Sequence, residues 1–151
     1  MFVVRGAWSV TRSFVENFAS LETSVYMAPR SITSLEVWRL AICAVKDVYG
    51  LTRGWPREEL YGLTSQARRA AISVPANIAE GAGRKGPGDV ARFVQIALGS
   101  LYELDTLVEI ATELSYTRAE EIESLRERLT ILTRKTTHLI KYQPSKRGIA
   151  H

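Results

Sequence analysis

Two glutamates are the residues whose type and setting could support catalysis. Glu80 and Glu103, with Asn77, are polar positions in segments of apolar and small residues that have helical periodicity. Carboxylates that face each other between helices can serve as general acid and base, or bind a metal. No nucleophile or histidine accompanies them, so we favour a hydrogen-bond network, with Arg69 or Arg92 balancing the acids. We predict no catalytic residues and expect that the protein is not an enzyme.

Metal and cofactor chemistry is not indicated either. The single cysteine, Cys43, excludes an internal disulfide, and His138 and His151 are too far apart in sequence to argue for metal binding. Residues 81–86 match G-x-G-x-x-G, but a helical pattern precedes them where a dinucleotide site needs a strand. The phosphate-loop pattern fails because Pro87 follows the last glycine. We therefore expect no cofactor and interpret this segment as a loop that ends a helix.

The segment that must position these side chains is residues 61–84. It carries an apolar stripe at helical spacing, and Pro75 inside it should kink the helix. Arg68 and Arg69 point about 100° apart, so only one of them can face the interior. A second stripe is polar and, with one glutamate of the following helix, predicts a structural polar seam. Its members are Gln66, Arg69, Ser73, Asn77, Glu80 and Glu103.

Three further helices complete the expected fold. One begins near Ser34, one near Asp89, and one after Thr117, which has capping-box spacing with Glu120. We predict an all-α, antiparallel up-down four-helix bundle over residues 31–143. Residues 1–30 would be an N-terminal extension, either disordered or a short packing helix, with Met27 as an alternative start. Residues 144–151 would be a flexible tail.

Composition favours one domain in the cytoplasm. The 151 residues have a net charge of +4, and no apolar run approaches the ~18 residues of a membrane span. Arg5 and Arg12 interrupt any apolar core of a secretion signal. We expect neither a membrane partner nor a small-molecule substrate.

The charges are distributed unevenly along the chain. Residues 103–127 hold eight acids and two bases, whereas residues 128–147 hold six bases and no acid. In an up-down bundle the loop after the second helix lies at the same end as the C-terminus of the fourth. The sequence therefore predicts one basic end, with ordinary solubilising charge as the alternative interpretation. The predicted nucleic-acid-binding residues there are Arg84, Lys85, Arg92, Lys141, Lys146 and Arg147.

The motif YGLTSQ-x-RRAA-x-S-x-P-x-NIAEG, residues 61–81, resembles the signature of the bacterial four helix bundle proteins. Some of these are encoded by intervening sequences in 23S ribosomal RNA genes, and accessory proteins of diversity-generating retroelements share the bundle. The similarity extends over residues 35–116, including LEVW at 35–38 and IALGSL at 96–101. It implies the four-helix fold and a homo-oligomer, a ring of five. Residues 1–30 depart from the family pattern.

Two function classes therefore stand beside the disfavoured enzyme. The first is a non-catalytic protein that binds nucleic acid, with RNA rather than DNA as the expected partner, through phosphate contacts at the basic end. The second is a protein–protein scaffold whose charges serve solubility alone. Salt-dependent binding of RNA would distinguish the first from the second.

Overall fold

Helices make up nearly all of residues 35–141, the part of the chain that the computed structural model describes. No strand occurs among these residues, so the predicted all-α fold is confirmed. Two short 3-10 helices, η3 and η4, connect the first two α-helices. In chain order the elements are α2 (Glu36–Leu51), η3 (Thr52–Gly54), η4 (Arg57–Glu59), α3 (Leu63–Ala82), α4 (Pro87–Glu113) and α5 (Ala119–Lys141).

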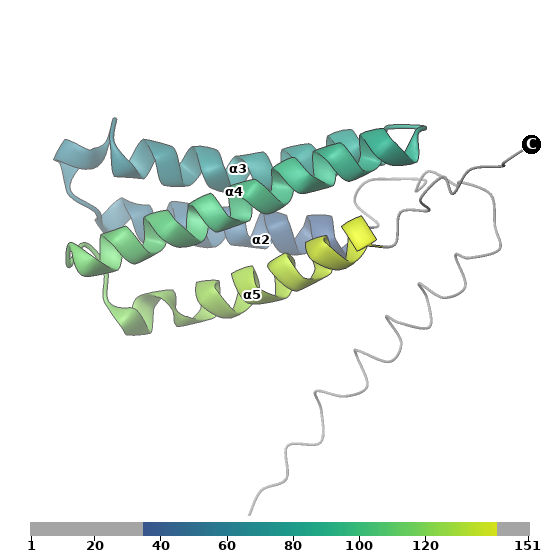
Figure 1. The fold of residues 1–151 in the computed structure, drawn as a ribbon. Coiled ribbons are helices and arrows are strands. Elements are labelled where there is room, and N and C mark those ends of the chain that lie inside the picture. The colour runs from purple at the N-terminus through teal and green to yellow at the C-terminus, as the bar shows by residue number, and fades with distance from the viewer. Residues whose placement is uncertain (1–34, 142–151) are drawn as a thin grey trace, which may run out of the picture.

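The four α-helices are antiparallel neighbours along the chain. Helix α3 packs on α2 and α4, and α5 packs on α4 and α2, which closes the bundle (Figure 1). The α3–α4 loop and the end of α5 therefore lie at one end of the molecule. The α2–α3 connection and the α4–α5 loop lie at the other end. Short connections between antiparallel helices are typical of this architecture.

The core follows the apolar periodicity of the sequence. Leu101, Leu104, Ile122, Leu125 and Leu132 are the largest fully buried side chains. Burial of such side chains contributes about 1.5–3 kcal/mol each relative to exposure. On α3 the small residues Ala67, Ala70 and Ala71 are buried, which lets α2 and α4 each approach α3 closely. Pro75 is also buried, inside a helix that continues past it to Ala82.

The helix starts differ from the expected ones. Helix α4 begins at Pro87, whose fixed φ and missing N–H suit a first turn. The glutamate that caps the start of α5 is Glu121 and not Glu120, because α5 begins one residue later than the Thr117 spacing implied. Glu121 then lies one turn after Arg118, whose backbone N–H it accepts.

Several predictions fall on residues outside the described ones. They are the N-terminal extension at 1–30, the tail at 144–151, and the predicted binding residues Lys146 and Arg147. Within the described part, none of the helices combines the length and apolarity needed to cross a membrane.

Candidate nucleic-acid interface

The loop between α3 and α4 presents two adjacent basic residues at one end of the bundle. The N–H of Gly83 donates to the carbonyls of Ala79 and Glu80, both at 3.2 Å. The N–H of Arg84 then donates to the Gly81 carbonyl at 3.1 Å. These bonds terminate α3 and leave only a short connection before α4. Arg84 and Lys85 are both exposed on this connection.

Arg84 makes two side-chain contacts. Its guanidinium forms an ion pair with Glu80, one helical turn earlier, and lies 4.9 Å from the ring centre of Phe93 on α4. Gly81 permits this arrangement, since a Cβ there would lie 3.2 Å from the Phe93 Cβ. The close approach of α3 and α4 at Gly81 thus sets the ring beneath the guanidinium.

Lys85 and Arg92 differ from Arg84 because neither has an ion pair among the described residues. Lys85 lies just before the N-terminus of α4, and Arg92 is exposed within the helix's second turn. The positive end of the α4 dipole adds to their field, although Asp89 in the first turn partly opposes it. Lys85 and Arg92 are therefore available cations.

The end of α5 reaches the same end of the bundle. Lys141 is its last residue, so its backbone lies at the end that carries the α3–α4 loop (Figure 1). Arg134, about two turns earlier, is exposed and has no ion pair among the described residues, and we did not single it out from the sequence. Arg134 lies opposite the buried Leu132 and Thr136 on the helical wheel, and this position could have predicted its exposure from the sequence.

Other basic residues of α5 are neutralised on the flanks of the bundle. Arg128 Nε donates to Asp47 Oδ2 at 2.7 Å, and Lys135 Nζ lies 3.2 Å from Glu36 Oε1. Arg126 pairs with Glu109 on α4. Part of the basic run in the sequence therefore connects α5 to its neighbours.

The predicted polar seam is divided by the structure. Asn77 Nδ2 donates to the Ser73 carbonyl at 2.8 Å and to Ser73 Oγ at 3.0 Å. The hydroxyls of Ser73 and Ser100 are 2.8 Å apart, which links α3 to α4. Ser100 is a member that the sequence prediction missed, because it lies next to the apolar seam of α4.

The remaining predicted seam residues are exposed, namely Gln66, Arg69, Glu80 and Glu103. Because Gly81 lies level with Phe93, Glu80 and Glu103 are about 15 Å apart along the helix axes. This separation does not support a shared acid–base site. No cluster of His, Cys, Asp and Glu suited to a metal occurs among the described residues.

At the opposite end, side chains tie the connections to the bundle. The half-buried Arg68 donates from Nε to Thr52 Oγ1 at 2.9 Å and lies over the Tyr49 ring at 4.7 Å. Its neighbour Arg69 is exposed. The two arginines thus point apart as predicted, but the inner one is Arg68, bonded to a threonine, and not Arg69, which the predicted seam placed inside.

Glu59 connects η4 to the start of α3 and to the α4–α5 loop. Its Oε2 accepts the N–H of Leu63 at 2.9 Å, and its Oε1 accepts the hydroxyl of Tyr116 at 3.1 Å. That hydrogen bond to Glu59 raises the pKa of Tyr116, and desolvation adds to the effect. A side chain at Gly62 would collide with Glu59, since its Cβ would lie 2.5 Å from Oε2.

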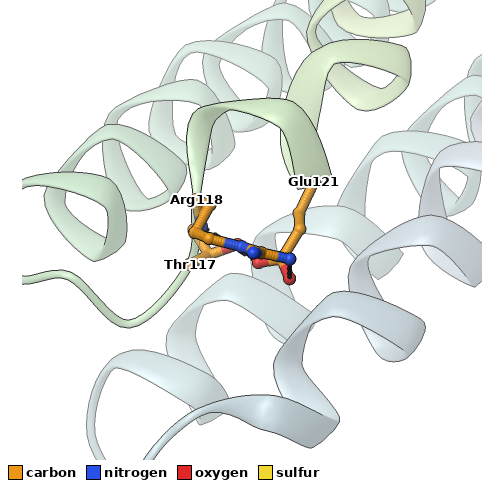
Figure 2. Close-up of polar contacts among 3 residues, drawn as sticks. All are labelled: Thr117, Arg118 and Glu121. Atoms are coloured by element: carbon orange, nitrogen blue, oxygen red, sulfur yellow. Dashed lines mark hydrogen bonds and ion pairs between the residues drawn. The ribbon is translucent and has the colours of Figure 1, made fainter.

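The turn before α5 is held by one carboxylate. Glu121 Oε2 accepts the backbone N–H of Arg118 and the hydroxyl of Thr117, both at 3.0 Å (Figure 2). Its other oxygen contacts the Arg118 guanidinium at 3.1 Å. The backbone hydrogen bond, followed by the two side-chain hydrogen bonds, lowers the pKa of Glu121.

The fold is that of a small all-α protein, a four-helix bundle with exposed basic residues in the α3–α4 loop at one end. Residues 33–138 match the family described as 23S rRNA-intervening sequence protein, and the chain belongs to that family. A solved structure with the same fold is a protein of unknown function from the S23 ribosomal protein family of Bacteroides thetaiotaomicron. It has 22% sequence identity and a TM-score of 0.65 over 70% of this chain and 98% of that one. No curated protein matches the chain.

Proposed function

We propose that this protein binds RNA without catalysing a reaction, as a cytoplasmic homo-oligomer. The observation that carries the proposal is the exposed Arg84–Lys85 pair in the short α3–α4 loop, beside the positive end of α4. The family's description, which refers to 23S rRNA, agrees with an RNA partner. The proposed phosphate contacts are Arg84, Lys85, Arg92 and Lys141, with Lys146 and Arg147 from the tail.

Charge neutralisation with counterion release would provide the binding energy. Lysine and arginine contacts to phosphate release condensed cations, so affinity should fall steeply as salt rises. Sequence discrimination should be weak, because phosphate contacts carry no base information. A homo-oligomer presents the same end in every subunit, so modest charge per subunit would give useful avidity.

The outer faces of α3 and α4 support the assembly. Ile72 on α3 and Ile96 and Ile110 on α4 are each more than 40% exposed, although they belong to apolar helices. A Cβ at Gly99, between the two α4 isoleucines, would meet nothing within 4 Å, so there is open space for a neighbour. We propose that a second copy of this chain covers this face, in the ring of five that the family resemblance implies.

The assembly is tested by light scattering on the parent and on Ile96→Glu. The parent should be an oligomer at micromolar concentration, and a charge at the contact should dissociate it. Arg53→Glu, exposed and away from this face, should leave the assembly intact. A monomeric parent would contradict the proposed assembly.

RNA binding is tested with paired charge reversals at the two ends. Arg84→Glu with Lys85→Glu should abolish most binding of a single-stranded RNA at low salt. Arg53→Glu with Arg57→Glu makes the same charge change on exposed residues of the opposite end and should bind nearly as well as the parent. If both double variants lose binding equally, the effect is net charge and the site assignment is wrong.

A scaffold function is the second candidate, and one surface favours it. Tyr61 is 92% exposed at the end opposite the basic loop, with Leu60 and Leu114 about half exposed at the same end. Tyrosine is enriched among the residues that carry most of the binding energy at protein interfaces. Absence of RNA binding at every salt concentration, together with salt-insensitive capture of a protein partner that Tyr61→Ala abolishes, would favour this function.

A further inference from the structure

One carboxylate already occupies the basic loop at the place where a phosphate would bind. Glu80 is the last acidic residue of α3, and its side chain reaches the Arg84 guanidinium one turn later. The two side chains are 49% and 45% exposed, respectively, so water and solute reach both. Lys85 and Arg92 have no such partner among the described residues. Arg84 is thus the one exposed arginine of this loop whose charge is compensated locally.

The Phe93 ring determines which part of Arg84 stays available. The guanidinium carbon lies 4.9 Å from the ring centre, which is a cation–π distance. An arginine held over a ring still offers its N–H groups to a planar acceptor such as a carboxylate or phosphate. Gly81 fixes this geometry from the other helix, because any larger residue would press on the Phe93 Cβ.

We propose that Glu80 is a built-in competitor for RNA phosphate at Arg84, an inference that rests on the proposed RNA-binding function. In the free protein the Glu80 carboxylate accepts the Arg84 N–H donors. When RNA binds, a phosphate oxygen replaces the carboxylate, and Glu80 swings into solvent. Phe93 is a positioning residue that keeps the guanidinium at the loop during the exchange.

The exchange is feasible because the existing pair is weak. Exposed ion pairs separated by four residues on a helix contribute little to stability and are screened by salt. A phosphodiester on RNA brings neighbouring phosphates to Lys85 and Arg92 as well, which a single carboxylate cannot do. Glu80 therefore lowers affinity for isolated anions more than for a polyanion, and so favours extended RNA over small phosphates.

The test uses Glu80→Gln, which keeps the length and helix propensity of the side chain but removes its charge. Affinity for a single-stranded oligouridylate should rise about two- to tenfold at low salt, because Arg84 no longer has an anionic partner and phosphate meets one fewer negative charge. The matched control is Glu113→Gln, an exposed glutamate at the far end of α4 with the same charge change. It should raise affinity much less.

A second pair of variants shows whether Glu80 acts through Arg84. In an Arg84→Gln background, Glu80→Gln should give no more gain than Glu113→Gln gives. Phe93→Leu in the parent should weaken RNA binding severalfold without changing oligomeric state or helical content. Inorganic phosphate, a single anion that can reach Arg84 but cannot span to Lys85 and Arg92, should gain at least as much affinity from Glu80→Gln as RNA does, and a smaller gain than that of RNA would contradict the inferred preference for extended RNA.

Two outcomes separate this inference from the proposed function. If the parent binds RNA and the Arg84–Lys85 reversal weakens binding, but Glu80→Gln equals Glu113→Gln, then RNA binding stands and the competitor inference is wrong. If the parent binds no RNA at any salt concentration, the proposed function fails and the inference fails with it.

Discussion

The two ends of this bundle are built on different principles. At one end, Glu59, Thr52 and Glu121 hold the α2–α3 connection and the α4–α5 loop through hydrogen bonds to other elements and to backbone. At the other end, the α3–α4 loop has local backbone bonds, and its longest side-chain contact is Arg84 over Phe93. Hydrogen bonds from polar side chains fasten one end, whereas the basic side chains of the α3–α4 loop at the other end are exposed to solvent.

This difference separates stability from binding. Carboxylates at the fastened end accept backbone N–H groups that helix starts leave unpaired, so they stabilise the fold. Cations at the basic end satisfy no backbone group, so their removal costs the fold little. Substitutions at the fastened end should therefore lower stability, whereas substitutions at the basic end should weaken RNA binding and change stability little.

The largest expected effect is on Trp55, which follows η3 and is 6% exposed. Trp55→Ala should lower the free energy of unfolding by about 3–5 kcal/mol, because it removes a large side chain from the core. Lys85→Ala at the basic end should change it by less than about 0.5 kcal/mol. Urea unfolding followed by circular dichroism measures both.

A second substitution sharpens the reason for the Trp55 effect. Its indole N–H has no hydrogen-bond partner among the described residues, which is an energetic cost in a buried site. Trp55→Phe should therefore be far milder than Trp55→Ala, since it keeps much of the volume and removes the unpaired donor. Equal losses for the two variants would contradict this explanation.

Glu59→Gln should have the next largest effect. The amide keeps one acceptor but loses the charge that favours both the Leu63 N–H and the Tyr116 hydroxyl, so we expect a loss of about 1–2 kcal/mol. Glu58→Gln is the matched control, since Glu58 is exposed on the same 3-10 helix. A loss of equal size in the control would show that net charge, not the tie, matters.

Among the substitutions at the fastened end, Glu121→Gln should have the smallest effect on stability, and it should depend on pH. Three hydrogen bonds, the one from the Arg118 backbone N–H first, lower the pKa of Glu121 from its usual range, so the folded state favours the ionised form. This stabilisation is fully present above the unfolded-state pKa and disappears as pH falls through the folded-state value.

The difference in thermal midpoint between the parent and Glu121→Gln should therefore be constant near neutral pH and vanish in acid. Glu120→Gln provides the control, because the structure gives the Glu120 carboxylate no hydrogen bond among the described residues. A difference that persists unchanged at acidic pH would rule out ionisation of Glu121 as its source.

The sequence predicted the helices better than their ends and side-chain partners. Periodic apolar residues at Leu101, Leu104 and Val108 were sufficient to predict a buried seam, because burial is averaged over several turns. The capping glutamate was misplaced by one residue, since Thr117 and Arg118 both precede α5 closely enough to begin it. Which of the two residues begins α5 depends on the geometry of the α4–α5 loop, and that geometry is set by tertiary packing.

The candidate site was predicted only in part for a similar reason. Adjacent Arg84 and Lys85 in a glycine-rich loop were evident from the sequence, and their exposure follows from the loop. The compensation of Arg84 by Glu80 is a local i, i+4 relation, yet Glu80 was assigned to a polar seam. The packing of Gly81 against Phe93 places the last turn of α3, which carries Glu80, beside the α3–α4 loop. This contact between two helices is not visible in the sequence.

The central claim is that RNA phosphates are bound at the α3–α4 end, and salt dependence tests it most directly. The measurement is the slope of the logarithm of the RNA association constant against the logarithm of salt concentration. We predict a steep linear fall for the parent, a clearly shallower slope for the Arg84→Glu, Lys85→Glu variant, and the parent's slope for Arg53→Glu, Arg57→Glu. Equal slopes in all three proteins, or a shallower slope for the second variant alone, would contradict the account.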